Sequence, residues 1–139
     1  MVLNHTAEYA LRAVLMIAAE PEGGAVPAVR LSRGLRLPQN YLSKTLHQLA
    51  RAGVLESTRG KSGGFRLARS ADRIRLLEVV QPFSDMTGER TCLMGRAECS
   101  DRNACSAHLR WKRVSETLAE FFRETTVADL ATSLPGRSS

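Results

Sequence analysis

The sequence predicts a mainly α-helical domain that carries one small β-hairpin. Apolar residues recur at helical spacing in several segments, and two short strand-like runs flank a glycine-rich stretch. The length of 139 residues is enough for one compact domain with an appended helix. We therefore expect one folding unit followed by an extension, and no second large domain.

Three helices are expected before the hairpin. The first covers residues 6–20, where apolar side chains form one broad stripe that ends at Pro21. A short amphipathic turn at residues 29–33 is expected to end at Gly34. The third helix covers residues 38–52, with Pro38 at its start and Gly53 as its C-terminal stop. This order of helix, tight turn and helix is typical of a helix-turn-helix motif.

The third helix has an apolar side and a polar side. Leu42, Leu46 and Leu49 recur every three or four residues and are expected to be buried. The other side carries amides, hydroxyls and cations but no acid, a composition that suits base edges and phosphates in a major groove. The residues of this helix that are expected to contact DNA are Gln39, Asn40, Tyr41, Ser43, Lys44, His47 and Arg51.

A β-hairpin of the kind called a wing is predicted at about residues 54–68. Strand-like runs at 54–59 and 65–68 flank the sequence GKSGG, whose glycines supply the backbone freedom that a hairpin turn needs. Arg59 and Lys61 at the tip, with Arg66 and Arg69 beside them, are expected to reach an adjacent minor groove or the DNA backbone.

The positive charge of the chain is concentrated in this region. Residues 30–75 contain eleven lysines and arginines but only two acidic residues, whereas residues 84–139 contain eight of each sign. Such a local excess indicates a polyanionic partner. Residues 1–83 are therefore expected to form a winged helix-turn-helix domain that binds double-stranded DNA. A winged helix that binds another protein is the alternative, and it leaves the charge unexplained.

The second half of the chain is predicted to contain a cysteine segment and a long helix. A short helix at 74–83 ends at Pro82, and a loop at 84–105 holds all three cysteines. Residues 106–134 are expected to form a long helix to about Thr125 and then a short terminal helix, and residues 135–139 a frayed tail.

The long helix is expected to mediate dimerisation. Its apolar stripe consists of Trp111, Val114, Leu118, Phe121 and Phe122. An amphipathic helix of this length needs a partner surface, which a second copy of the chain would supply in a homodimer. The alternative is a helix folded back on its own domain. In a homodimer, the two DNA-contacting helices would address a roughly palindromic operator.

The cysteines indicate metal or redox chemistry. Their odd number argues against a structural disulfide framework, and three thiolates from one loop can surround iron. Cys92, Cys99 and Cys105 are the candidate ligands. His108 is the nearest fourth donor, because it follows Cys105 by three residues at the start of a helix. A structural zinc site with three cysteines and one histidine, or a redox switch of free thiols, remains an alternative.

Other classes of protein fit the sequence poorly. It contains no Ser-His-Asp order, no paired-carboxylate motif and no phosphate-binding glycine loop, so an enzyme is not expected. The apolar N-terminal residues are interrupted by Glu8, Arg12 and Glu20, which is unlike a signal peptide or a membrane span. We expect a cytoplasmic protein with no membrane partner.

Several phrases together resemble one known family. EYALRAVLMIA, then NYLSKTLHQLARAGVLESTRGKSGGFRLAR, then the cysteine cluster before a helix ending in ETTVADLA, resemble the Rrf-type family of bacterial winged helix-turn-helix transcriptional regulators, which includes IscR-like and NsrR-like iron–sulfur regulators. The resemblance spans nearly the whole chain. It implies a homodimeric DNA-binding regulator whose iron–sulfur cluster, held by the three cysteines, tunes operator affinity in response to redox, nitric oxide or iron status.

The resemblance also bears on details of the site. It implies a 2Fe-2S or a 4Fe-4S cluster, of which we favour 2Fe-2S, and it implies Glu8 of the partner subunit as the alternative to His108 for the fourth ligand. Three features depart from the family pattern. Lys61 and Ser62 replace a Pro-Gly pair in the wing turn, Ser43 replaces an acidic residue often found in the DNA-contacting helix, and the first cysteine gap is one residue longer than usual.

Overall fold

The computed structural model describes residues 3–60, 63–84 and 108–131, except for the side chains of Glu22 and His108. Within these ranges the chain consists of helices and one antiparallel β-hairpin, as the sequence predicts. The elements in chain order are α1 (His5–Ala18), η1 (Pro21–Gly23), α2 (Ala28–Leu35), α3 (Gln39–Arg51), β1 (Leu55–Thr58), β2 (Gly64–Leu67), η2 (Ala71–Arg73), α4 (Leu76–Val80), α5 (His108–Glu124) and α6 (Val127–Ala131).

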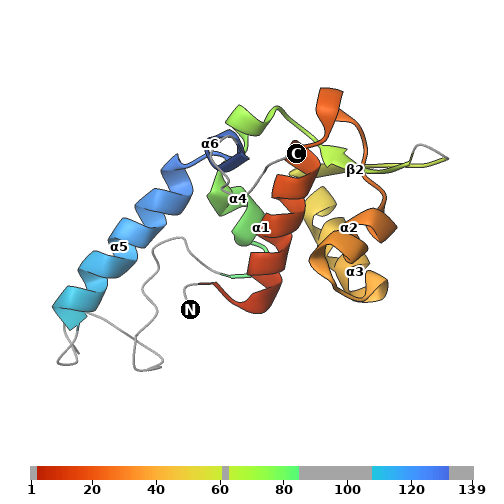
Figure 1. Ribbon diagram of the computed structural model, residues 1–139. Helices are drawn as coiled ribbons and strands as arrows, with labels where there is room; N and C mark the ends of the chain where they lie inside the picture. Colours follow the sequence, from red (N-terminus) through yellow and green to blue (C-terminus); the bar gives the residue numbers. More distant parts are fainter. Residues whose placement is uncertain (1–2, 61–62, 85–107, 132–139) are drawn as a thin grey trace.

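Helix α1 lies at the centre of the molecule (Figure 1). It contacts α2, α3 and β2 on one side and α4 and α6 on the other. Small apolar residues on α1 allow these elements to approach closely, and larger side chains fill the space between them. The buried residues include Ala7, Ala10, Ala13, Val14 and Ile17 of α1, Leu31 of α2, Leu42, Leu46 and Leu49 of α3, Phe65 of β2, and Leu76, Val79 and Val80 of α4.

The turn between α2 and α3 differs from the sequence prediction. Helix α2 continues through Gly34, and the left-handed residue that ends it is Arg36, with φ of 57°. Gly34 faces α1, and a Cβ atom there would lie 2.4 Å from Cε of Met16, so a larger residue would make the end of the Met16 side chain move. The turn is closed by the Leu37 amide, which donates to the Ser32 carbonyl (3.0 Å), and by the Ser32 hydroxyl, which donates to the Leu37 carbonyl (2.8 Å).

The hairpin has the expected position and a defined register. Leu55 pairs with Leu67, and Thr58 pairs with Gly64. On its other side, β2 exchanges two backbone hydrogen bonds with Val26, at Phe65. A Cβ atom at Gly64 would lie 2.4 Å from the Val26 carbonyl, and the φ of Gly64 is +148°, so this position requires glycine.

Helix α4 is shorter than the predicted segment at 74–83. The preceding residues are extended, because Arg75 forms an isolated β-bridge with Thr126 and the Val127 amide donates to the Ile74 carbonyl (2.9 Å). This pairing connects the start of α4 with the junction of α5 and α6.

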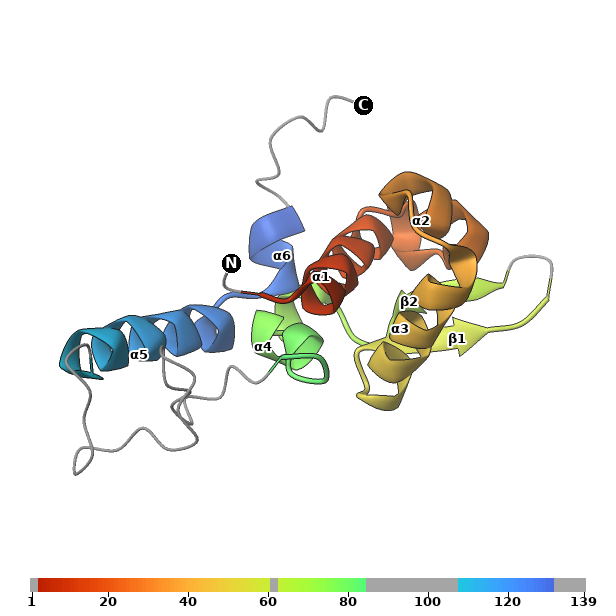
Figure 2. The same cartoon turned by 90° about the horizontal axis from the view of Figure 1, so that it is seen from below.

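Helix α5 projects away from the body of the molecule, and the hairpin projects in the opposite direction in both views (Figures 1 and 2). The buried residues among those described in α5 are Ala119 and Phe122, near its C-terminal end, which are 3% and 5% exposed. None of the described helices is long and apolar enough to cross a membrane. The predicted cysteine segment, the wing residue Lys61, the continuation of the last helix to 134 and the predicted tail lie outside the described residues.

Candidate nucleic-acid interface

Helix α3 presents the predicted polar residues on one side. Gln39, Asn40, Tyr41, Lys44, His47 and Arg51 are exposed and Ser43 is half-buried, whereas the leucines of the opposite side are fully buried. Pro38 precedes the helix as its N-cap residue. The buried leucines fix the rotation of α3 about its axis, and this rotation directs the polar side chains toward solvent.

The C-terminal half of this polar side is hollowed. Lys44, His47, Gln48 and Arg51 line an open depression of about 460 Å³. The ring of His47 also packs edge-on against Phe65 of β2, with 5.3 Å between ring centroids, so α3 and the hairpin are in direct contact. Gln48 was missing from the predicted set, although its position one turn after Lys44 could have indicated it. Two cations and two hydrogen-bonding side chains in one depression suit phosphate and base contacts.

The described cations of this region fall into two groups. Arg30, Arg66 and Arg69 form ion pairs with Glu20 (2.8 Å), Glu56 (3.0 Å) and Glu78 (2.6 Å). Hydrogen bonding to Glu20 raises the pKa of Arg30 above its ordinary value. Among the described residues, the cations that form no such pair include Arg33, Arg36, Lys44, Arg51 and Arg59. Arg33 and Arg36 flank the turn before α3 and were also missing from the predicted set.

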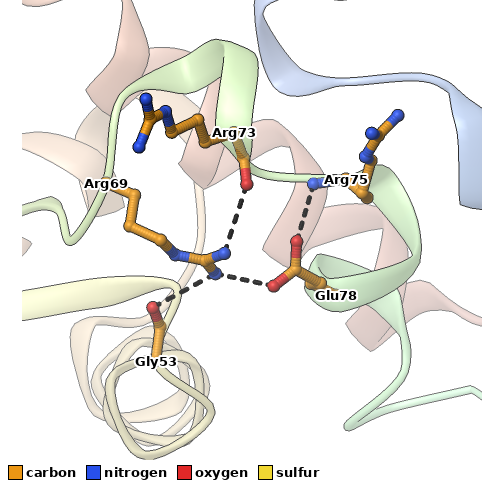
Figure 3. Close-up of polar contacts among 5 residues, drawn as sticks. All are labelled: Gly53, Arg69, Arg73, Arg75 and Glu78. Atoms are coloured by element: carbon orange, nitrogen blue, oxygen red, sulfur yellow. Dashed lines mark hydrogen bonds and ion pairs between the residues drawn. The ribbon is translucent and has the colours of Figure 1, made fainter.

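Arg69 has a structural environment that differs from the expected DNA contact. Its guanidinium donates to the carboxylate of Glu78 and to the Arg73 carbonyl (3.2 Å) and contacts the Gly53 carbonyl at 3.5 Å (Figure 3). Desolvation raises the pKa of Glu78, but hydrogen bonds from Arg69 and the Arg75 amide outweigh it, so the pKa lies below its ordinary value. Arg66 is likewise paired across the hairpin with Glu56. Both arginines therefore already have a carboxylate partner within the chain.

The N-terminal end of α3 is attached to α1 through Tyr41. The hydroxyl groups of Tyr41 and Thr6 lie 2.7 Å apart and share a hydrogen bond. The ring of Tyr9 packs edge-on against Tyr41 and stacks with His5, with ring centroids about 6 Å apart in both pairs. Tyr41 is still 37% exposed, so its ring edge faces solvent beside the other polar residues of α3.

The candidate metal ligands are only partly covered by the structure. Cys92, Cys99 and Cys105 lie outside the described residues, and His108 begins α5. Glu8 lies in the first turn of α1, where its carboxylate is 3.3 Å from the guanidinium of Arg12. The described residues contain no cluster of three His, Cys, Asp or Glu side chains able to hold a metal ion. The start of α5 lies away from the start of α1 in both views (Figures 1 and 2).

Comparison with known proteins identifies the family. The model of the Rrf2 family, described as iron-dependent transcriptional regulators, matches residues 3–133. The chain belongs to the Rrf2 family. An HTH-type transcriptional regulator of Aquifex aeolicus is 30% identical over 94% of this chain and 91% of its own length, and the HTH-type transcriptional regulator IscR of Klebsiella pneumoniae is 29% identical over 94% and 79%.

A solved structure has the same fold. CymR, the global cysteine regulator of B. subtilis, superposes with a TM-score of 0.79 over 95% of this chain and 97% of its own, at 20% sequence identity. The predicted family and the predicted winged-helix fold are both confirmed. As an Rrf2 protein the chain is a DNA-binding transcriptional regulator, and its relatives are regulators and not enzymes.

Proposed function

We propose that the protein is a homodimeric regulator whose operator affinity is set by an iron–sulfur cluster held by Cys92, Cys99 and Cys105. One observation carries the proposal. All three cysteines of the chain lie within 14 residues, between the DNA-binding part and the long helix α5, in a member of a family described as iron-dependent. Thiolates are the usual ligands of iron–sulfur clusters, and histidine takes the place of some of them in certain clusters.

DNA contacts are assigned to α3 and the wing. The exposed amides and cations of α3, from Gln39 to Arg51, enter the major groove, and Arg59 and Lys61 reach the backbone or the minor groove beside it. The depression lined by Lys44, His47, Gln48 and Arg51 supports this assignment, since it combines positive charge with hydrogen-bond donors and acceptors.

The exposed apolar side of α5 supports dimerisation. Leu109, Val114 and Phe121 are 70%, 49% and 48% exposed, and the half-buried Leu118 lies between the last two on the same side. A helix that projects from the body with this much apolar surface gains stability by packing against another surface. A second copy of α5 supplies a matching one around a two-fold axis, and it brings two α3 helices to a palindromic operator.

Cluster type and fourth ligand follow the family resemblance. We favour a 2Fe-2S cluster, with His108 of α5 or Glu8 of the partner subunit as the fourth ligand. The placement of Glu8 in a different part of the same chain from His108 is compatible with a ligand donated across the dimer. When bound, the cluster supplies a centre that oxidants or nitric oxide alter. The residues that would transmit such a change are those between α4 and α5.

The test is anaerobic purification followed by iron and sulfide analysis, absorbance and operator binding. We expect a brown protein with one cluster per chain, and Cys99→Ala should lose both the colour and the response of operator affinity to oxidant. Ser100→Ala, the neighbouring substitution, should keep both. A colourless wild type with stoichiometric zinc, or with a reversible disulfide and no iron, would exclude the cluster. Mass measurement by sedimentation tests the homodimer independently.

A further inference from the structure

The base of the hairpin, the end of α3 and the start of α4 meet in one set of polar contacts, here called the polar cluster: Gly53, Arg69, Arg73, Arg75 and Glu78 (Figure 3). Arg69, which follows β2, places its Nη2 2.6 Å from Oε1 of Glu78 in α4 and 3.5 Å from the carbonyl of Gly53, just after α3. Its Nη1 donates to the Arg73 carbonyl at 3.2 Å. One planar guanidinium therefore connects three elements, and its rigid shape fixes the directions of its hydrogen bonds relative to one another.

The polar cluster continues into α5 through Arg75. The second oxygen of Glu78, Oε2, accepts a hydrogen bond from the Arg75 amide (2.9 Å). Nη1 of Arg75 donates to the carbonyl of Glu124, the last residue of α5 (3.1 Å), and the next amide, Leu76, donates to the Thr125 carbonyl (2.9 Å). An unbroken series of contacts thus runs from the end of α3 to the end of α5.

Both apolar packing and polar contacts lie between these elements. Ala119 and Phe122 of α5 are buried, but burial of apolar surface is non-directional. Charge-assisted hydrogen bonds are short and have preferred directions, and Glu78 uses both of its oxygens in them. The Arg69–Glu78 pair therefore adds directional contacts to the apolar packing and to the backbone hydrogen bonds that join α4 to the end of α5.

We propose that Arg69 and Glu78 are positioning residues that fix the angle between the DNA-contacting part (residues 28–67) and α5, and thereby determine the half-site spacing that the dimer accepts. The inference rests on the proposed function, because a spacing exists only where α5 joins two copies. In a two-fold dimer any rotation at the polar cluster occurs once in each subunit. The two rotations together change the distance between the two α3 helices.

Glu78→Gln tests the proposal, with Glu56→Gln as the matched control. The amide that this substitution introduces offers one acceptor oxygen, so it cannot bond Arg69 and the Arg75 amide as the carboxylate does. Glu56 forms a comparable ion pair with Arg66 at 3.0 Å, but that pair is confined to the hairpin. Arg69→Lys is a second variant, which keeps the charge but loses the planar fork.

The probe is DNA selected by the wild type from a random pool with spacers of varied length. Affinity is then measured for the selected operator, for versions with one base pair added to or removed from the spacer, and for a single half-site. We expect the wild type to prefer one spacing about tenfold, because a solvent-exposed ion pair contributes under about 1 kcal/mol and the pair acts twice in the dimer. Glu78→Gln and Arg69→Lys should largely lose this preference while keeping single-half-site affinity and dimer mass. Glu56→Gln should keep it.

Three results would overturn the proposal. The first is a Glu78→Gln variant that retains the spacing preference of the wild type. The second is a Glu78→Gln variant that loses as much affinity for the single half-site as for the operator. The third is a Glu56→Gln variant that loses the spacing preference as Glu78→Gln does. A monomeric wild type, or one that selects no paired half-sites, refutes the dimeric function itself and with it this inference. Sedimentation and the wild-type selection therefore separate the two failures.

Discussion

Replacement of Phe121 by serine is the sharpest test of how α5 is covered. Phe121 is 48% exposed, and its ring packs edge-on against the buried Phe122, so its outer half is the part that a second copy would cover. A phenylalanine side chain contributes roughly 200 Å² of surface, of which about 100 Å² would become buried in the dimer. At about 25 cal/mol per Å², burial contributes roughly 2.5 kcal/mol per subunit.

Because a two-fold interface uses the residue twice, Phe121→Ser should weaken the dimer by about 5 kcal/mol, or more than about a thousandfold in Kd. The assay is sedimentation velocity over a dilution series, together with the thermal midpoint of unfolding. Glu120→Ser is the matched control, since Glu120 is the exposed neighbour in the same helix and receives the same new residue. A dimer Kd for Phe121→Ser within about threefold of that of Glu120→Ser, which is under 1 kcal/mol, would refute burial of this side of α5 by a second copy.

Three further predictions concern stability and DNA binding. Gly64→Ala should lower the free energy of unfolding in urea by about 2 kcal/mol or more, because the new Cβ atom meets the Val26 carbonyl. Gly53→Ala should lower it by only about 1 kcal/mol, because Gly53 has a φ of +84° but no atom within 4 Å of the new Cβ position. Lys44→Gln should flatten the slope of log operator affinity against log salt concentration by about 1.8, which is about 0.9 for each subunit of the dimer, and an unchanged slope would remove Lys44 from the phosphate contacts. The folded-state pKa of Glu78 lies below its ordinary value of 4.5, so its contribution to stability is present above about pH 4.5 and is lost as the pH falls through the lowered pKa. Glu78→Gln should therefore lose less stability to urea on acidification than the wild type does, and equal acid profiles would contradict a stabilising role of the Glu78 carboxylate.

Much of the fold could be predicted because it depends on local periodicity. The stripe of α3 and the glycine-rich turn of the hairpin each specify one structure from a few neighbouring residues. The end of α2 could not be predicted in this way. A glycine near a helix end normally marks the stop, but Gly34 is inside the helix and faces the side chain of Met16, eighteen positions earlier in the chain. Arg36 then adopts the left-handed conformation that glycine usually takes.

The candidate site shows a similar division. The polar side of α3 follows from its helical repeat, so its residues could be named from the sequence alone. The roles of the arginines could not, because charge counting does not tell which cations already have partners. The Arg66–Glu56 pair follows from the hairpin register and was within reach of the sequence. The Arg69–Glu78 pair was not, since it depends on how η2 returns the chain from the hairpin to α4.

The contacts at the two ends of α3 connect it to α1 and α4, so the three helices are expected to move as one unit. Its N-terminal end is attached to α1 by the Tyr41–Thr6 hydrogen bond, and its C-terminal end to α4 through Gly53 and Arg69. Helix α1 is in turn attached to the end of the α4 region, because the Asn4 side chain donates to the Phe83 carbonyl at 2.7 Å. A rotation at α5 that leaves these contacts intact moves α3 together with α1 and α4. A change at α5 should therefore alter affinity for paired half-sites more than affinity for one.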